Sequence, residues 1–188
     1  RLQVINDKGN VVADWTTDGK SNHQLVGKLI VGQTYTLHEA SAPNEYTLAS
    51  DKTFTVKETT EVQTVTMVNK KKTGNVTLYK QDGDGNVLKG SEWKLYNADG
   101  TLVSLVQTGN GQYQTNTNNR AEVLSTDNDG VLRVYNLPLG DYYFVENKSP
   151  NGTFTYGDKI EFTISAESDK TLNPELTVQN NKIILQNT

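Results

Sequence analysis

Apolar and polar residues alternate along most of this chain, as they do in half-buried β-strands. In residues 34–39, for example, Tyr35, Leu37 and Glu39 would lie on one face of a strand. Further runs of this kind are residues 54–56, 65–69, 76–80 and 141–146. No stretch of a dozen residues shows a helical period, so the pattern predicts an all-β chain.

Short turn signals rich in Asp, Asn and Gly separate these runs. They lie at residues 8–10, 18–19, 82–86, 98–100 and 129–130. Such residues favour tight turns between strands. Many short strands at regular spacing are typical of an immunoglobulin-like β-sandwich.

The sequence also contains a loose internal repeat. The matched blocks are residues 4–12 with 95–103, 35–43 with 142–150, 54–56 with 162–164, and 65–69 with 183–187. Four blocks in the same order indicate a duplicated module. We therefore expect two tandem β-sandwich modules, residues 1–72 and 73–188. Almost no linker separates them, which favours a stiff tandem.

The two modules differ in length and completeness. The offset between matched residues grows from 91 at Val4 and Leu95 to 107 at Glu39 and Glu146, so the second module holds 16 extra residues. These fall in a polar stretch around residues 107–125. The first module lacks an opening strand, and we expect it to unfold and be proteolysed before the second.

Composition narrows the class of protein. The 188 residues carry a formal net charge of −4, and no basic stripe is present, so a nucleic-acid partner is not expected. No apolar run approaches the roughly 20 residues that span a bilayer, and no signal peptide is seen. The chain has the character of a fragment of a longer protein. Because it has no cysteine, a secreted form would need a stabilising device other than disulfides.

In each of three predicted strands of the second module, apolar residues at alternate positions are followed by one polar residue on the same face. The polar residues are Lys80, Glu146 and Asn187. The apolar rows before them are Val76 and Leu78, Tyr142 and Phe144, and Ile183 and Leu185. Burying an isolated charge is costly, so we expect the three polar side chains to meet inside the sandwich.

If they meet, their chemistry is specific. A desolvated lysine loses its proton readily and becomes a nucleophile. A buried glutamate can hold a proton and pass it to a leaving group. Attack by Lys80 on the Asn187 amide, assisted by Glu146, would form an isopeptide bond and release ammonia. Asn180 is a second candidate acceptor, but the Asn180-Asn181 pair is typical of a hairpin turn, which favours Asn187.

These motifs resemble the Cna B-type, SpaA-like domains of Gram-positive surface adhesins and sortase-assembled pilins. The segments that carry the resemblance are residues 32–46, 76–80, 90–95, 136–142, 146–150 and the last strand to Asn187. The resemblance implies an inverse immunoglobulin, transthyretin-like sandwich with isopeptide chemistry at Lys80, Glu146 and Asn187. It implies matching roles for Glu39 and Asn69 in the first module, although that module lacks its lysine strand.

Two departures from the family pattern are visible in the sequence. Glu45 stands where the family usually has glycine, and neither a sorting signal nor a pilin polymerisation motif is seen.

The expected function is that of a stalk segment in a cell-wall-anchored adhesin or pilin on the surface of a Gram-positive bacterium. Its expected partners are neighbouring domains of the same protein, and also other pilin subunits or a host matrix ligand, with no membrane contact in this fragment. No cofactor, no metal and no turnover enzyme activity are expected. The Asp-rich turn at residues 82–86 lacks the Gly and Glu of a calcium loop.

Two alternatives remain open. One is a ligand-binding adhesin module for a host matrix protein or glycan that uses residues 107–125. The other is an accessory sandwich of a secreted carbohydrate enzyme.

Overall fold

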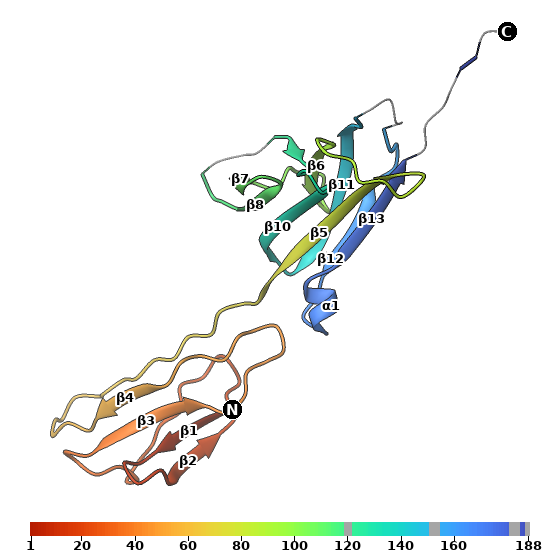
Figure 1. The fold of residues 1–188 in the computed structure, drawn as a ribbon. Helices are drawn as coiled ribbons and strands as arrows, with labels where there is room; N and C mark the ends of the chain where they lie inside the picture. The colour runs from red at the N-terminus through yellow and green to blue at the C-terminus, as the bar shows by residue number, and fades with distance from the viewer. Residues whose placement is uncertain (119–121, 151–154, 181–184, 187–188) are drawn as a thin grey trace. The chain divides into compact units, whose positions relative to one another are not determined.

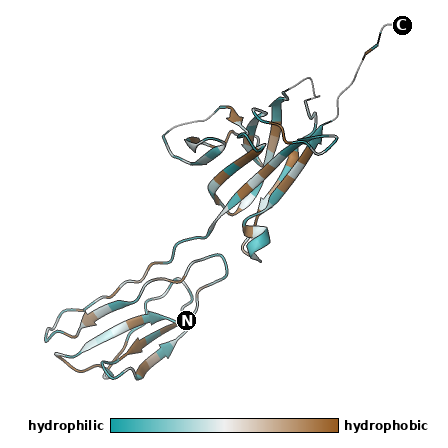
Figure 2. Cartoon of the chain, in the orientation of Figure 1, coloured by the Kyte–Doolittle hydropathy of each residue, from teal (hydrophilic) through white to brown (hydrophobic). Residues whose placement is uncertain are grey.

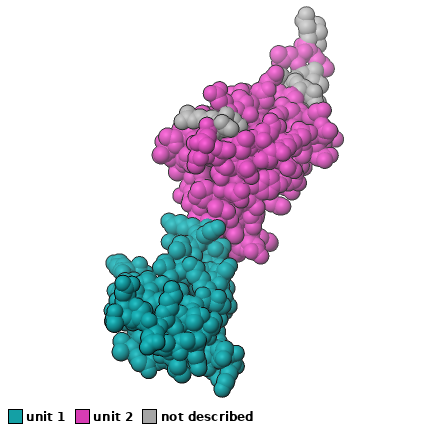
Figure 3. All heavy atoms as spheres, turned by 90° about the vertical axis from the view of Figure 1, so that its left-hand side faces the viewer, with its two compact units in different colours: residues 1–71 teal, residues 72–188 magenta. Residues whose placement is uncertain are grey.

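The computed structural model describes residues 1–118, 122–150, 155–180 and 185–186. The chain divides into two compact units, Arg1–Lys71 (unit 1) and Lys72–Thr188 (unit 2), shown in separate colours in Figure 3. Both are built from β-strands, and the described part of unit 2 adds one short helix, α1 (Asp169–Leu172). The predicted all-β fold class is confirmed. Within the described residues, no helix is long and apolar enough to cross a membrane.

Unit 1 contains one antiparallel sheet with the strand order β2-β1-β3-β4 (Figure 1). Its strands are β1 (Leu2–Ile5), β2 (Val11–Trp15), β3 (Thr34–Glu39) and β4 (Lys52–Thr55). On β3, Tyr35, Leu37 and Glu39 are buried, as the alternation predicts. Val4 and Ala13 complete the buried core of this unit.

Unit 2 is a sandwich of two sheets. One sheet has the order β13-β5-β10-β8-β7 and the other has the order β12-β11-β6-β9 (Figure 1). The strands are β5 (Thr73–Asp82), β6 (Glu92–Asn97), β7 (Leu105–Gly109), β8 (Gln112–Thr115), β9 (Leu124–Ser125), β10 (Val131–Pro138), β11 (Gly140–Lys148), β12 (Ile160–Ile164) and β13 (Glu175–Asn180). Apolar side chains from both sheets form one continuous core.

Strand β5 organises the larger sheet. It pairs antiparallel with β10 and parallel with β13. Every second residue of β5 is buried, beginning at Gly74 and continuing through Val76, Leu78, Lys80 and Asp82. The alternation of hydrophobic and hydrophilic residues along such strands is visible in Figure 2. Lys80 is therefore held inside the sandwich by the phase of its own strand.

Part of the extra length of unit 2 adds to its larger sheet. Strands β7 and β8 form an antiparallel hairpin, and β8 continues the sheet by pairing in parallel with β10. The first half of the polar stretch predicted around residues 107–125 thus extends the sheet. Leu105 and Tyr113 anchor the hairpin because both side chains are buried in the core.

Gly74 permits a close approach between β5 and helix α1. A Cβ atom at this position would lie 1.9 Å from the carbonyl oxygen of Leu172 and 2.6 Å from Cγ2 of Ile164. The Leu172 contact is with backbone, which cannot rotate away as a side chain could. Glycine is therefore needed here for space.

We expect Gly74→Ala to lower the free energy of unfolding of unit 2 by about 1 to 3 kcal/mol, the usual range for overpacking. The measurement is denaturant unfolding followed by Trp93 fluorescence in a Trp15→Phe background. Gly157→Ala is the matched control, because a Cβ there meets no heavy atom within 4 Å and should change stability by no more than about 0.5 kcal/mol. Equal effects of the two substitutions would contradict the packing argument.

Candidate functional site

Three polar side chains meet inside unit 2, and each comes from a different strand. Lys80 lies in β5, Glu146 in β11 of the facing sheet, and Asn180 at the end of β13. The parallel pairing of β13 with β5 places Val178 opposite Lys80. Because side chains alternate along a strand, Asn180 has the same inward phase as Val178. The cluster thus joins both sheets of the sandwich.

The Glu146 carboxylate is the centre of this cluster. Its Oε1 atom lies 3.5 Å from Nζ of Lys80. Its Oε2 atom accepts a hydrogen bond of 2.6 Å from Nδ2 of Asn180. Lys80 has no exposed surface, and Glu146 and Asn180 are each only 4% exposed. The amine and the amide are therefore held against the two oxygens of one buried carboxylate.

Two further groups fix the orientation of Glu146. The Ser91 hydroxyl donates to Oε1 at 2.9 Å, and the backbone N–H of Tyr156 donates to Oε2 at 2.5 Å. Ser91 is itself fully buried, and its backbone N–H donates to the hydroxyl of Thr126. Sequence reasoning missed Ser91 as a site residue, because a single serine before a strand carries no distinctive pattern. Its proximity to Glu146 depends on how β6 and β11 pair.

The surroundings make the Lys80 ammonium easier to deprotonate than a lysine in water. Trp93, the partner of Glu146 in the β6–β11 register, is fully buried and in edge contact with Phe144. Burial lowers the pKa of the Lys80 ammonium below its ordinary 10.5, and the neighbouring Glu146 carboxylate opposes this shift without cancelling it. A lysine in this setting gives up its proton more readily than one in water.

The structure differs from the sequence interpretation of the acceptor. Asn180 was predicted to lie in a turn, and this is wrong, because it is the last residue of β13 and pairs with Asp82 of β5. Asn187, the acceptor favoured by the sequence, lies outside the described residues. Among the described residues, Asn180 is the asparagine whose side chain contacts Glu146.

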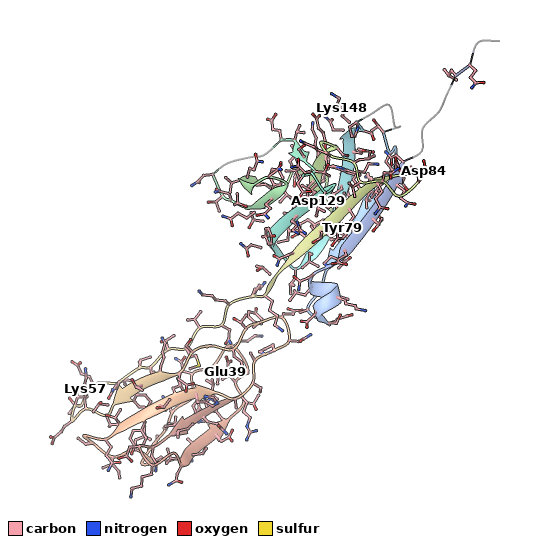
Figure 4. The ribbon with its side chains drawn as sticks, viewed as in Figure 1. Glu39, Lys57, Tyr79, Asp84, Asp129 and Lys148 are labelled. Atoms are coloured by element: carbon pink, nitrogen blue, oxygen red, sulfur yellow. The ribbon has the colours of Figure 1, made fainter. Side chains whose placement is uncertain are left out.

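Unit 1 contains the same glutamate–asparagine arrangement. Oε2 of Glu39, at the end of β3 (Figure 4), accepts hydrogen bonds from Nδ2 of Asn69 at 2.6 Å and from the backbone N–H of Ala49 at 2.7 Å. Ala49 follows Glu39 by ten residues, just as Tyr156 follows Glu146. The geometric counterpart of Asn69 in unit 2 is therefore Asn180.

The two units differ in the third member of the cluster. Glu39 is only 6% exposed, yet no described lysine or arginine forms an ion pair with it. In unit 2 that place beside the glutamate is taken by Lys80. Glu39 and Asn69 thus meet as the sequence led us to expect, without an amine.

Comparison with protein families identifies the class of both units. The SpaA prealbumin-like fold domain matches residues 1–71 and again residues 74–182. The chain therefore belongs to this family, with one domain copy in each unit. This confirms the predicted resemblance to Cna B-type, SpaA-like domains and the transthyretin-like form of the sandwich. Comparison with curated protein sequences finds no significant match.

Solved structures with a similar fold include several pilus proteins. The chain matches the Bacillus anthracis TIE protein with a TM-score of 0.59 and 24% identity, over 95% of this chain and 29% of that one. It matches the shaft pilin SpaA from Lactobacillus rhamnosus GG with a TM-score of 0.51 and 18% identity, over 99% and 88%. The group B streptococcus pilus 2b backbone protein gives 0.50 and 18%, over 96% and 77%.

At sequence identities below 25%, the likeness to these structures shows a shared fold and nothing further. The chain spans less than a third of the TIE protein and 46% of a streptococcal ancillary pilin, which it matches with a TM-score of 0.50 and 24% identity.

We expect the Glu146→Leu variant to be less stable than the double variant Lys80→Met/Glu146→Leu, by about 3 kcal/mol. Both variants lack the carboxylate, so they differ only in whether an amine remains buried without a counter-charge. Denaturant unfolding of unit 2 measures the difference. If the two variants had equal stability, Lys80 would not depend on Glu146 for its burial.

Proposed function

We propose that Lys80 and Asn180 become joined by an isopeptide bond and that the chain is a tension-bearing segment of a bacterial surface protein. The observation that carries this proposal is the contact of both side chains with one carboxylate in a fully buried site. The proposal takes Asn180 as the acceptor because its amide contacts Glu146.

The reaction is an exchange of one amide for another. Nζ of Lys80 passes a proton to Oε1 of Glu146 and then, as a neutral amine, attacks Cγ of Asn180. Glu146 returns that proton to the amide group and takes a second proton from Nζ. The Cγ–Nδ2 bond breaks, ammonia leaves, and Glu146 ends protonated. Atoms and charge balance without an oxidant, reductant or cofactor, and each chain reacts once, so the protein is not a turnover enzyme.

The site supports this chemistry through its dryness and its fixed geometry. Amine, carboxyl and amide are all nearly or fully inaccessible to solvent, which limits competing hydrolysis of the amide. Ser91 and the Tyr156 backbone hold the carboxyl group in place. Such prior positioning removes much of the entropic barrier to a reaction between two groups.

The position of the bond explains a mechanical role. Lys80 lies in the first strand of unit 2 and Asn180 at the end of the last strand among the described residues, and the two strands pair side by side. Tension along the chain would pass through the covalent link and would not load the hydrogen bonds of the sandwich. The link closes a loop of 100 residues, which in the chain-entropy model stabilises the fold by about 4 to 5 kcal/mol.

The location that we propose for the chain is supported by this role and by the proteins that share its fold. Proteins of the same fold include a shaft pilin and a pilus backbone protein. A covalent tie of this kind would replace disulfides in a chain without cysteine. We place the segment outside the cell, in a cell-wall-anchored adhesin or pilin of a Gram-positive bacterium. Its partners are neighbouring domains and other subunits.

The decisive experiment is the intact mass of the folded chain. We expect it to lie about 17 Da below the sequence value, because one ammonia is lost. Asn180→Ala should restore the full mass, and Asn187→Ala should keep the loss. A loss that persists in Asn180→Ala and disappears in Asn187→Ala would return the acceptor to Asn187. The full mass in well-folded wild-type protein would remove the proposal.

The pH dependence of stability gives a second test, in the Asn180→Ala variant, whose Lys80 amine stays free. In the folded unit the pKa of Lys80 is lower than the ordinary 10.5 of the unfolded chain. Between these two values the unfolded chain binds more protons, so the free energy of unfolding should rise with pH across that window. Lys80→Met/Asn180→Ala should lack this component. The same pH dependence in both variants would contradict the lowered pKa.

A further inference from the structure

We propose that the free edge of β7 pairs with the β7 edge of a second copy of this chain, so that two copies associate side by side through one continuous sheet. The inference does not depend on the isopeptide bond, because β7 and β13 lie at opposite ends of the larger sheet. Three observations support it: the free hydrogen-bonding groups along this edge, the lack of charge on it, and a local pattern that is complementary to itself.

The first observation concerns the backbone of β7, which is the end strand of the larger sheet, beside β8 (Figure 1). In an antiparallel pair, the backbone groups of successive residues point alternately towards the partner strand and away from it. The N–H of Asn116 donates to the carbonyl of Ser104, so Ser104 and Val106 face β8. The N–H and C=O groups of Leu105 and Gln107 therefore point to the free side of β7. The register shifts only after Gln107, at the end of the strand.

The second observation is that β7 lacks the features that usually protect an edge. Exposed strand edges are commonly kept from pairing by charged side chains or by being very short. The other edge strands of the described sheets follow this rule. β9 has two residues, and β2, β4, β12 and β13 carry Asp14, Lys52, Glu161 and Glu175 in turn.

The five residues of β7 are all uncharged. Its surroundings in the sequence are uncharged as well, since no Asp, Glu, Lys or Arg occurs from Gly100 to Asn118. Charged residues nevertheless make up 21% of the whole chain. β7 is therefore, among the edge strands of the described residues longer than two residues, the one that is open to pairing.

The third observation is that the pattern of β7 fits a second β7. In an antiparallel pair centred on Val106, Leu105 of one copy lies opposite Gln107 of the other, and these residues exchange both backbone hydrogen bonds. Val106 then lies opposite Val106 of the other copy, in the position where the two Cα atoms are closest. The Leu105 side chain is buried in the core, so Val106 projects from the outer face. Two β-branched side chains would pack together there.

Charge also favours this arrangement. Each chain has a formal net charge of −4, so two copies repel each other where their charged faces approach. Along β7 no like charges would come to lie opposite each other. A twofold arrangement uses the same patch on both copies and closes at the dimer.

The contact that we propose is small. A pair of such short strands buries less surface than the roughly 1,200 Å² at which stable interfaces begin. We therefore expect the association of free chains to be weak and to depend on concentration. Copies held side by side on one surface would associate more strongly, because their effective concentration is high.

The first test follows the molar mass of the full chain by sedimentation equilibrium over a series of concentrations. We expect a dimer that is lost in Val106→Lys, because two ammonium groups would lie directly opposite each other. Val106→Thr, which stays uncharged and β-branched, should keep the dimer. Thr177→Lys is the matched control, because Thr177 is exposed on β13 at the other edge of the same sheet, and it should also keep the dimer.

Amide hydrogen exchange locates the contact in the same samples. The N–H groups of Leu105 and Gln107 should exchange rapidly in dilute solution and more slowly as the concentration rises. In Val106→Lys their exchange should stay rapid at every concentration.

A second arm applies even if Val106→Lys fails to fold. The chain has no cysteine, so Val106→Cys introduces a single thiol. In the proposed register the two Cα atoms of residue 106 would lie about 4.5 Å apart, within the range that a disulfide spans. Under mild oxidation, Val106→Cys should form a disulfide-linked dimer faster than the control Thr177→Cys.

Three outcomes would overturn the proposal. One is a monomer at every concentration together with equal rates of dimerisation for the two cysteine variants. Another is a dimer that Val106→Lys leaves intact, because the copies would then meet through a different surface. The third is protection of the Leu105 and Gln107 amides at every concentration, because the chain would then cover this edge itself. None of these outcomes involves the loss of ammonia in unit 2, so either proposal can fail while the other stands.

Discussion

The burial of the Lys80 charge is the constraint on which the rest of unit 2 depends. An ammonium group with no exposed surface needs a counter-charge within reach, and Glu146 supplies it from the facing sheet. The carboxylate is then shared with the Asn180 amide, the Ser91 hydroxyl and the Tyr156 backbone. One polar cluster thereby links the two sheets and fixes the placement of the Lys80 amine beside the Asn180 amide.

Strand pairing would let the isopeptide bond that we propose for this cluster carry tension. The first strand of unit 2 and the last strand that the structure describes lie next to each other and run parallel, in a register that sets Val178 opposite Lys80. The proposed covalent tie at this place would close almost the whole described unit into one loop. The same pairing also explains why Gly74 is needed, since the segment that leads into β13 crosses close to the start of β5. Strands β5 and β13 therefore take part both in the close packing at Gly74 and in the polar cluster.

The duplication shows which parts of the cluster belong together. In both units a buried glutamate accepts a 2.6 Å hydrogen bond from an asparagine side chain. In both it also accepts one from a backbone N–H ten residues later, from Ala49 in unit 1 and Tyr156 in unit 2. The glutamate–asparagine pair thus forms with or without a neighbouring lysine. Unit 1 has one sheet and unit 2 has two, and the larger sheet of unit 2 is built around the lysine strand β5.

The sequence by itself determined the all-β class and the inward phase of Lys80 and Glu146, because side chains alternate with a period of two along any strand. The strand that it predicted at residues 65–69 is wrong, because those residues lie outside the strands of unit 1. It also indicated the duplication, but its matched blocks paired Asn69 with Asn187, whereas the side-chain contacts make Asn180 the counterpart of Asn69. The two-residue period of side chains shows which face of a strand a residue occupies, but it does not show which strands pair with each other. Asn180 and Asn187 lie in similar local sequence patterns. Only the parallel register of β13 against β5 brings Asn180 to Glu146. Ser91 entered the site for the same reason, through contacts between strands that no local pattern encodes.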